Sequence, residues 1–236
     1  MEEFWLAPPM EPYIVTKTPS YLILYKPPRM HTVPLRPGEG GTLLAWIAAR
    51  YPEVLRIKGR KEIEGGLVHR LDYETHGLVL CARTDDVMNM LLDKQKKGEI
   101  VKDYEAVCRK ETNAALPGFP PLPAGFAMHE PTVIESAFRP FGRGRAAVRP
   151  IPAENTGHKP GELYRTEIIS YTEIGDKCFF KLRIRKGFRH QIRCHLAWIG
   201  RPIVNDPVYV KEGRELSAPG FLALRATGIV FNKNIF

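Results

Sequence analysis

The sequence predicts an α+β fold with a mixed, largely antiparallel β-sheet core flanked by helices. Segments with the period of a strand outnumber segments with the period of a helix. Most of these strand segments follow one another along the chain instead of alternating with helices, which argues against a doubly wound sheet. No internal repeat or coiled-coil heptad is visible.

The first half of the chain predicts three strands and two helices. Residues 13–26 indicate two short strands around a Pro-Ser turn, and residues 76–83 indicate a short buried strand. Thr42 is placed to cap a first helix, whose predicted apolar face consists of Leu43, Leu44, Ile47 and Tyr51. Thr84 or Asp85 is placed to cap a second helix over 85–97, which Gly98 ends.

Residues 99–109 predict another strand. Its two predicted faces consist of Val101, Asp103, Glu105 and Val107 on one side and of Lys102, Tyr104 and Ala106 on the other. Residues 111–131 are rich in Pro, Gly and Ala and predict a long loop or flap, and residues 151–162 predict a similar loop. The remaining predicted elements are strands near 163–171 and 177–185, a helix over 189–200, and short strands near 220–224 and 228–232.

Composition is that of a globular protein, with 44% hydrophobic and 26% charged residues in 236. No apolar run approaches the roughly 18 residues that a membrane span needs, and the acidic N-terminus does not resemble a secretory signal. We therefore expect a cytoplasmic protein without membrane association. The four cysteines form no CxxC pair, so we expect reduced, buried thiols.

Basic residues exceed acidic residues by 35 to 26, and their placement is uneven. Residues 139–149 hold four arginines and no acid, and residues 181–195 hold six Lys or Arg and no acid. In the second run, Lys181, Arg183 and Arg185 alternate with apolar residues as on a strand. Arg189 and Arg193 then follow one helical turn apart. This pattern indicates a clamp for phosphate or carboxylate, with an ordinary solvated surface as the alternative.

The stretch GGLVHRLDYETHG, residues 65–77, places Asp72 two residues after Arg70 and between two apolar runs. The simplest interpretation is a turn with a surface ion pair. A metal site would draw on His69, Asp72, His76, His190 and His195. Their spacing fits no common helix-borne site, so we expect no metal. A general base would need a raised pKa, whereas a nucleophile must be ionised, and a neighbouring arginine keeps a carboxylate ionised.

Three blocks resemble the signature sequences of the RluA-type RNA pseudouridine synthases. They are HRLD at 69–72, KDYEAV at 102–107 and RHQIRCHLAWIGRPIVNDPVY at 189–209, and YLILYKPP is similar to that family's first core strand. The resemblance covers roughly residues 13–232. It implies a pseudouridine synthase-like fold with a central basic cleft, an isomerase that converts uridine to pseudouridine in ribosomal or transfer RNA, and no cofactor.

The resemblance also implies residue roles. Asp72 would attack the sugar or the base, or assist departure of the uracil. Arg193 would pair with Asp72, Tyr104 would stack on the uracil, and Arg70 would occupy the space that the flipped base leaves. We expect His69 and Leu71 to be structural. The predicted RNA-binding arginines are Arg70, Arg183, Arg185, Arg189, Arg143 and Arg145.

Some residues depart from the family pattern and bear on the substrate. Tyr73 stands where Lys or Arg is frequent, His76 where Ser is frequent, Arg189 where Thr is common and Asn205 where Gly is frequent. We expect a single catalytic domain over 1–236, without a separate N-terminal RNA-binding domain, and a monomer. Two alternatives stay open: a non-catalytic RNA-binding or ribosome-assembly protein on the same fold, and a metal-dependent RNA hydrolase.

Overall fold

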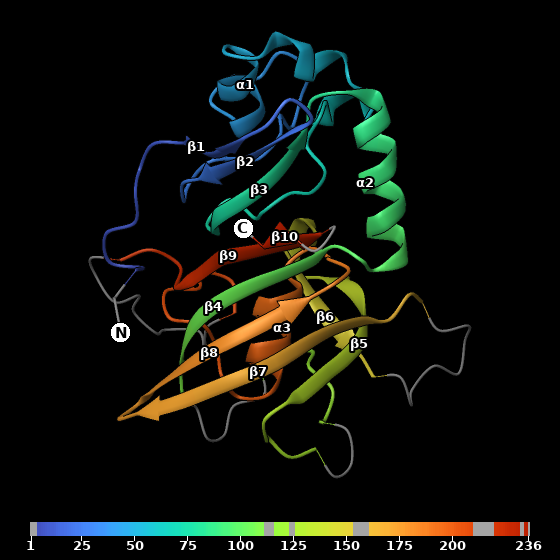
Figure 1. Cartoon of the computed structure of the whole chain (residues 1–236). Helices are drawn as coiled ribbons and strands as arrows, with labels where there is room; N and C mark the ends of the chain where they lie inside the picture. Colours follow the sequence, from blue (N-terminus) through green and yellow to red (C-terminus); the bar gives the residue numbers. More distant parts are fainter. Residues whose placement is uncertain are drawn as a thin grey trace. The chain divides into compact units, whose positions relative to one another are not determined.

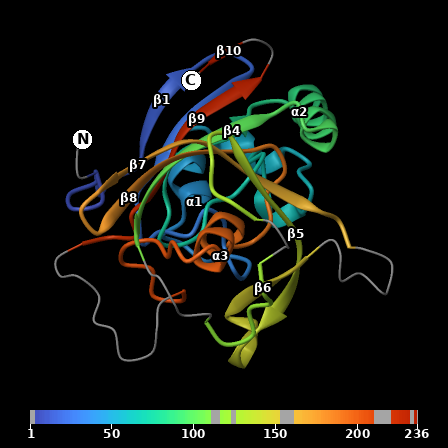
Figure 2. The same ribbon diagram turned by 90° about the horizontal axis from the view of Figure 1, so that it is seen from below.

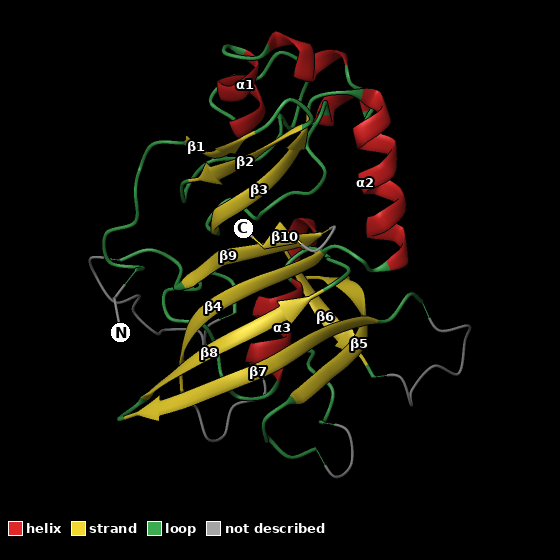
Figure 3. Cartoon of the chain, in the orientation of Figure 1, coloured by secondary structure: helices red, strands yellow, loops and turns green. Residues whose placement is uncertain are grey.

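The structure is a computed structural model that describes residues 4–110, 116–122, 126–152, 161–209, 220–231 and 234–235. The chain forms two compact units, 1–102 with 225–236 and 103–224. Strands predominate over helices in the described residues (Figure 3), so the predicted α+β class is confirmed. The predicted single domain stays a prediction.

The first unit is built on a mixed sheet (Figure 1). Its elements are β1 (Tyr13–Lys17), β2 (Tyr21–Lys26), α1 (Leu43–Ala48), the 3-10 turns Pro52–Arg56 and Glu62–Glu64, β3 (His76–Ala82), α2 (Asp85–Lys97), β9 (Leu224–Phe231) and β10 (Asn234–Ile235). β1, β2 and β3 are antiparallel neighbours, β3 pairs with β9 in parallel, and β10 pairs with β9. The parallel pair is what makes this sheet mixed.

The core of the first unit lies where α2 covers the sheet. Met88 and Leu91 of α2 pack with Ile23 of β2 and Leu80 of β3, and all four side chains are buried. Thr84 caps α2 by accepting a hydrogen bond from the Val87 amide, and Gly98 ends the helix in the left-handed conformation, as predicted.

The second unit is an antiparallel sheet with one helix. Its elements are β4 (Val101–Arg109), β5 (Thr132–Phe141), a 3-10 turn (Arg143–Arg145), β6 (Ala147–Ile151), β7 (Tyr164–Ile174), β8 (Lys177–Ile184) and α3 (Gln191–Trp198). β7 pairs with β8 and with β5, and β5 and β6 form a hairpin (Figure 2). A second cluster of buried residues, among them Val148, Cys194 and Tyr209, packs α3 against this hairpin.

Several sequence predictions need correction. Strands β5 and β6 lie outside the predicted strands; Arg139 and Pro140 interrupt the alternation only near the end of β5, whereas Arg149 and Pro150 interrupt it within β6. Within the described residues 220–231 there is one strand, β9, in place of the two predicted, and it runs through Gly228. α3 begins only at Gln191, since His190 adopts φ 58° outside the helix, so Arg189 is not helical. Tyr51 lies beyond the end of α1.

The predicted 111–131 loop holds no helix or strand where it is described, and residues 111–115 and 123–125 lie outside the described residues. Residues 116–120 are packed against the rest of the second unit. Phe119 contacts its core cluster, and the Pro120 carbonyl accepts a hydrogen bond from Trp198 Nε1 at 2.9 Å. This part of the loop is therefore held down, which does not favour a free flap.

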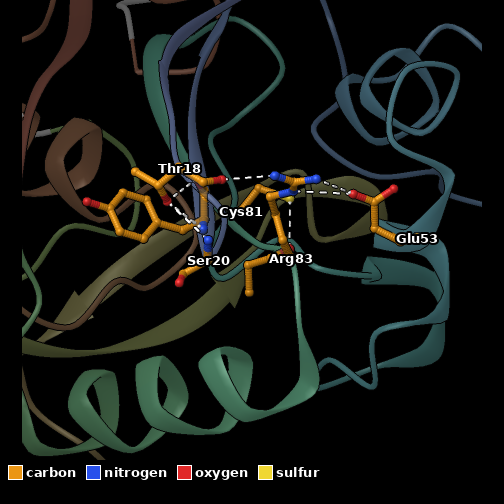
Figure 4. Close-up of polar contacts among 7 residues, drawn as sticks. Thr18, Ser20, Glu53, Cys81 and Arg83 are labelled. Carbon is orange, nitrogen blue, oxygen red and sulfur yellow. Dashed lines mark hydrogen bonds and ion pairs between the residues drawn. The ribbon is translucent and has the colours of Figure 1, made fainter.

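Arg83 ties together three segments of the first unit (Figure 4). Its Nη1 donates to the Thr18 carbonyl at 2.9 Å, and its Nη2 donates to Glu53 Oε1 at 2.8 Å. Thr18 in turn accepts from the Tyr21 amide at 2.9 Å, which closes the Pro-Ser turn between β1 and β2. The same guanidinium lies 4.9 Å from the centre of the Tyr51 ring.

We predict that Arg83→Ala lowers the free energy of unfolding by about 1–2 kcal/mol, because a carbonyl is left without its donor and a half-exposed ion pair is removed. Arg56→Ala, at an exposed position of the same unit, should change stability by less than about 0.5 kcal/mol. Urea titrations of both variants measure this. Equal effects in the two variants would contradict the role given to Arg83.

Candidate active site

Asp72 lies in a loop of the first unit, residues 69–75, which we call the acid loop. The chain enters this loop beside β3 and leaves it into β3: the Val68 amide donates to the Leu80 carbonyl at 3.0 Å, and β3 begins at His76. Within the loop, the Thr75 amide donates to the Asp72 carbonyl at 3.2 Å. The Asp72 residue is half-buried. The fold thus presents this carboxylate on a short turn with both ends fixed to one strand.

A buried lysine is hydrogen-bonded to the backbone of the acid loop. Lys26, at the end of β2, has no exposed surface, and its Nζ donates to the carbonyls of Pro27, Met30 and Tyr73 at 2.8, 2.7 and 3.3 Å. Burial lowers the pKa of Lys26 to about 7, while the carboxylates of Asp72 and Glu74 act to raise it. The three carbonyl acceptors match the three N–H groups of an ammonium. Lys26 therefore fixes the backbone of the loop through these hydrogen bonds.

Thr32 and Gly77 fix the loop at two further points. Thr32 Oγ1 accepts from the Leu71 amide at 3.1 Å and donates to the Leu71 carbonyl at 2.9 Å. Gly77 follows the loop with φ +119°, and a Cβ there would lie 2.1 Å from the Ala226 carbonyl oxygen of β9. Only glycine allows the two strands to approach in this way.

His69 and Leu71 are structural, as predicted. His69 is buried, its Nε2 accepts from the Leu80 amide at 3.2 Å, and burial keeps its pKa well below the usual value, with Lys102 and Arg60 adding to the effect. The ring is therefore neutral. Leu71, which is part of the acid loop, is buried.

Arg70 and Tyr73, which flank Leu71 and Asp72, are exposed. The Arg70 side chain is 55% exposed and its Nη1 lies 3.4 Å from Glu64 Oε1. The ordinary ion pair considered for Arg70 is thus present, and its role in filling a base stack stays a prediction. His76, by contrast, is buried, and burial lowers its pKa to about 3, with Arg225 and Lys26 acting in the same direction.

Arg193 and Asp206 form a buried ion pair in the second unit. Arg193 Nε donates to Asp206 Oδ2 at 2.7 Å, and Nη2 donates to Oδ1 at 2.8 Å. Burial acts to raise the pKa of Asp206, but the charge of Arg193, its hydrogen bonds and those from the Val208 and Tyr209 amides lower it. This two-pronged contact fixes the guanidinium of Arg193.

The role of Asp206 as the partner of Arg193 was not predicted. Its signal in the sequence is weak, because a single acid in the turn NDPVY looks like any Asp that begins a turn. The predicted partner of Arg193 is Asp72, which belongs to the other unit, and that pairing stays a prediction.

Tyr104 is buried on β4, on the predicted face with Ala106. On the opposite face Asp103 accepts hydrogen bonds from Arg183 Nε at 2.7 Å and from Nη2 at 3.1 Å. Arg183 thus has a partly buried carboxylate partner. The predicted contact of Arg183 with RNA would form while Arg183 stays paired with Asp103.

The other predicted RNA-binding arginines lie on or near the β5–β6 hairpin and β8. Arg143 and Arg145 are exposed in the turn of the hairpin. Arg189 is tied to the hairpin, since its Nη2 donates to the carbonyls of Arg145 and Ala147. Arg185 is exposed, with Nε 3.8 Å from Glu167 Oε1. The structure brings Arg143, Arg145 and Arg189 together, and their role in RNA binding stays a prediction.

Arg149, in the same basic run, is buried and anchors the loop of residues 116–120. Its guanidinium carbon lies 4.4 Å from the centre of the Phe119 ring and 4.1 Å from that of Phe141. Its Nε donates to the Pro117 carbonyl at 2.7 Å. This part of the basic run therefore stabilises the fold.

The cysteines and histidines form no further reactive cluster in the described ranges. All four cysteines are free and buried, as predicted. Among the described residues, no group of three His, Cys, Asp or Glu side chains could hold a metal ion. Within the same ranges, no helix is both long and apolar enough to cross a membrane.

Similarity to known proteins identifies the family. The sequence profile of the RNA pseudouridylate synthase family matches residues 20–198, a range that includes Asp72, Tyr104 and Arg193. The chain belongs to this family. Membership agrees with the resemblance of the three sequence blocks.

Individual relatives give the same result. An uncharacterized RNA pseudouridine synthase of Chloroflexus aurantiacus is 34% identical over 78% of this chain and 50% of its own length. The ribosomal large subunit pseudouridine synthase D of Escherichia coli is 30% identical over 83% of this chain and 52% of its own length. The chain spans about half the length of these curated relatives.

Solved structures share the fold. Human RNA pseudouridylate synthase domain containing 1 superposes with a TM-score of 0.65 at 20% identity, over 96% of this chain and 82% of that one. Human RNA pseudouridylate synthase domain containing 4 gives a TM-score of 0.60 at 17% identity, over 92% and 83%. These matches confirm the pseudouridine synthase-like fold.

We predict that Asp206→Asn lowers the free energy of unfolding by about 3 kcal/mol at pH 7, because Arg193 stays buried without its counter-charge. The folded-state pKa of Asp206 lies below 3.8, so its contribution is present above that pH and disappears as the pH falls through the lower value. Guanidinium titrations at pH 7 and at the lowest pH at which the wild-type protein stays folded measure both effects.

The matched control is Asp93→Asn, which removes an exposed carboxylate paired with Lys97. It should change stability by less than about 0.5 kcal/mol at either pH. If Asp206→Asn unfolded no more easily than Asp93→Asn, the ion pair would not be the stabilising contact described above.

Proposed function

We propose that this chain is an RNA pseudouridine synthase that isomerises uridine in structured RNA, with Asp72 as the nucleophile. The observation that carries the proposal is the family match over 20–198, with a carboxylate at position 72 on a turn whose backbone Lys26 and Thr32 hold. A loop fixed in this way can deliver a carboxylate to one reacting atom repeatedly.

The reaction needs little more than an acid and a way to hold the base. The bond from the sugar to N1 of uracil breaks, the base turns, and a bond from the sugar to C5 forms. The proton on C5 leaves and N1 gains one, so every heavy atom and all electrons are retained. Asp72 would attack the sugar or the base, or assist departure of the uracil. No redox step occurs, and we infer no cofactor.

The other predicted residues would bind the flipped base and the RNA strand. Tyr104 would stack on the uracil and Arg70 would fill the vacated stack. Arg193 would meet Asp72, with its guanidinium held by the two hydrogen bonds to Asp206. In that arrangement a guanidinium whose own position is fixed would lie beside the carboxylate.

The substrate would be ribosomal or transfer RNA. The name of the Escherichia coli relative refers to the large ribosomal subunit, so large-subunit ribosomal RNA is the first substrate to test. The exposed arginines 143 and 145 would contact its phosphates. We further infer a cytoplasmic monomer.

The central prediction concerns the carboxylate. Asp72→Asn should leave RNA affinity within about two-fold of wild type and lower kcat by several orders of magnitude, because the change removes the attacking charge but little volume. Pseudouridine formation is followed on transcribed ribosomal RNA by chemical mapping, and affinity by filter binding.

Asp86→Asn, an exposed acid of the same unit, should keep full activity. Turnover of Asp72→Asn above a few per cent of wild type would reject Asp72 as the nucleophile. A metal-dependent hydrolase would shorten the RNA and stop when a chelator is added, whereas the isomerase leaves RNA length unchanged. A wild-type chain that binds RNA but forms no pseudouridine would support the non-catalytic alternative.

A second prediction concerns the hairpin. The double variant Arg143→Ala/Arg145→Ala should weaken RNA binding and reduce the slope of log affinity against log salt by about 1.4, or about 0.7 for each phosphate that the variant no longer neutralises. Lys96→Ala, an exposed cation on α2, should leave the slope unchanged. Identical slopes for the wild type and the double variant would remove the hairpin turn from the RNA footprint.

A further inference from the structure

Tyr73 directly follows Asp72, and the fold leaves it 44% exposed although it is a large aromatic residue. Its position in the chain is one of the departures from the family pattern, where Lys or Arg is frequent. The functions assigned above to Asp72, Tyr104 and Arg193 make no use of this ring. The exposed Tyr73 ring beside Asp72 is therefore without an assigned function.

The Tyr73 ring is paired with a second ring. Its centre lies 4.7 Å from the centre of the His31 ring, at an angle of 42°. The backbone of His31 is held at the start of α1, where the Leu43 amide donates to the His31 carbonyl at 3.0 Å. The pair is therefore formed by two loops, one carrying the nucleophile and one preceding α1.

Hydrogen bonds and one ion pair connect these two loops at three points. Lys26 Nζ donates to the carbonyls of both Met30 and Tyr73. Thr32 Oγ1 is bonded to both backbone groups of Leu71. Arg29 Nε lies 3.8 Å from Glu74 Oε2. Because the backbones are held, the ring pair has a defined position, and a ligand that stacks on it loses little entropy in ordering the loops.

The charges around the rings favour a polyanion. Arg29 and Arg70 lie on the same two loops, and their side chains are 56% and 55% exposed. Their carboxylate partners, Glu74 and Glu64, are 3.8 and 3.4 Å away. Both guanidiniums are more than half exposed and can therefore also contact a phosphate, although the Glu64 carboxylate is itself buried.

Exposed aromatic rings flanked by arginines are the combination that binds single-stranded nucleic acid, with bases on the rings and phosphates on the cations. We propose that the Tyr73–His31 pair stacks a base of the RNA next to the target uridine and so helps to determine which uridine is accepted. This inference rests on the proposed function, because it takes Asp72 as the residue that meets the target uridine.

The test compares the affinities of a uridine pentanucleotide and of a pentanucleotide of the same charge without bases. Wild-type protein should bind the first more tightly. Tyr73→Ala should weaken binding of the uridine pentanucleotide by at least about five-fold, the lower end of what one stacked base contributes, with no change for the baseless one. Tyr73→Phe should behave as wild type, since it keeps the ring.

The matched control is Tyr13→Ala. Tyr13 is 45% exposed and its ring is stacked on that of Tyr25 at 4.7 Å, but it lies on β1 outside both loops. The Tyr13→Ala variant should bind both pentanucleotides with the affinity of wild type. His31→Ala should repeat the weakening seen in Tyr73→Ala, and the effect of the double variant should be smaller than the sum of the two.

Two results would overturn the inference: a Tyr73→Ala variant that binds the uridine pentanucleotide as wild type does, or equal weakening for the two pentanucleotides. Turnover on ribosomal RNA is measured separately. There, Tyr73→Ala should raise KM at least about five-fold and leave kcat unchanged. A wild-type chain without turnover whose binding still depends on the ring would reject the isomerase and keep the stacking site, so the two failures are distinguishable.

Discussion

The buried ammonium of Lys26 is the contact on which the acid loop depends. Its three N–H groups each meet a carbonyl, one of which belongs to Tyr73 in the loop itself. Removing a charged group of this kind from water is unfavourable, and the structure compensates with hydrogen bonds and with the nearby carboxylates of Asp72 and Glu74. A lysine in this position joins the end of β2, the loop before α1 and the acid loop.

The second unit contains a buried charge of the opposite sign, the carboxylate of Asp206. Asp206 is buried, and its two oxygens accept hydrogen bonds from Arg193 and from the amides of Val208 and Tyr209. A buried pair of this kind stabilises less than its geometry suggests, because both charges give up water. Its contribution is position: the Arg193 guanidinium can take one orientation only. In each unit, therefore, a buried ion fixes a group to which the proposed mechanism assigns chemistry.

Most of the fold could be predicted from the sequence where local signals agree. Thr84 and Gly98 mark both ends of α2, and Thr18, Pro19 and Ser20 mark the turn between β1 and β2. The signals failed where tertiary contacts decide. Arg149 looks like a surface cation in the sequence, but the rings of Phe119 and Phe141 bury it. Asp72 was singled out as a candidate by its neighbours and stays a prediction, whereas Lys26 and Asp206 were not singled out, because a buried charge is recognised only once its partners are placed.

The roles proposed for Asp72, Tyr104 and Arg193 all require that this chain converts uridine to pseudouridine in RNA. The most direct measurement is a transcriptome-wide pseudouridine map of cells with the gene, without it, and without it but supplied with the gene again. We expect at least one uridine, in ribosomal or transfer RNA, that is modified only when the gene is present. Identical maps in all three strains, with the protein shown to be expressed, would contradict it.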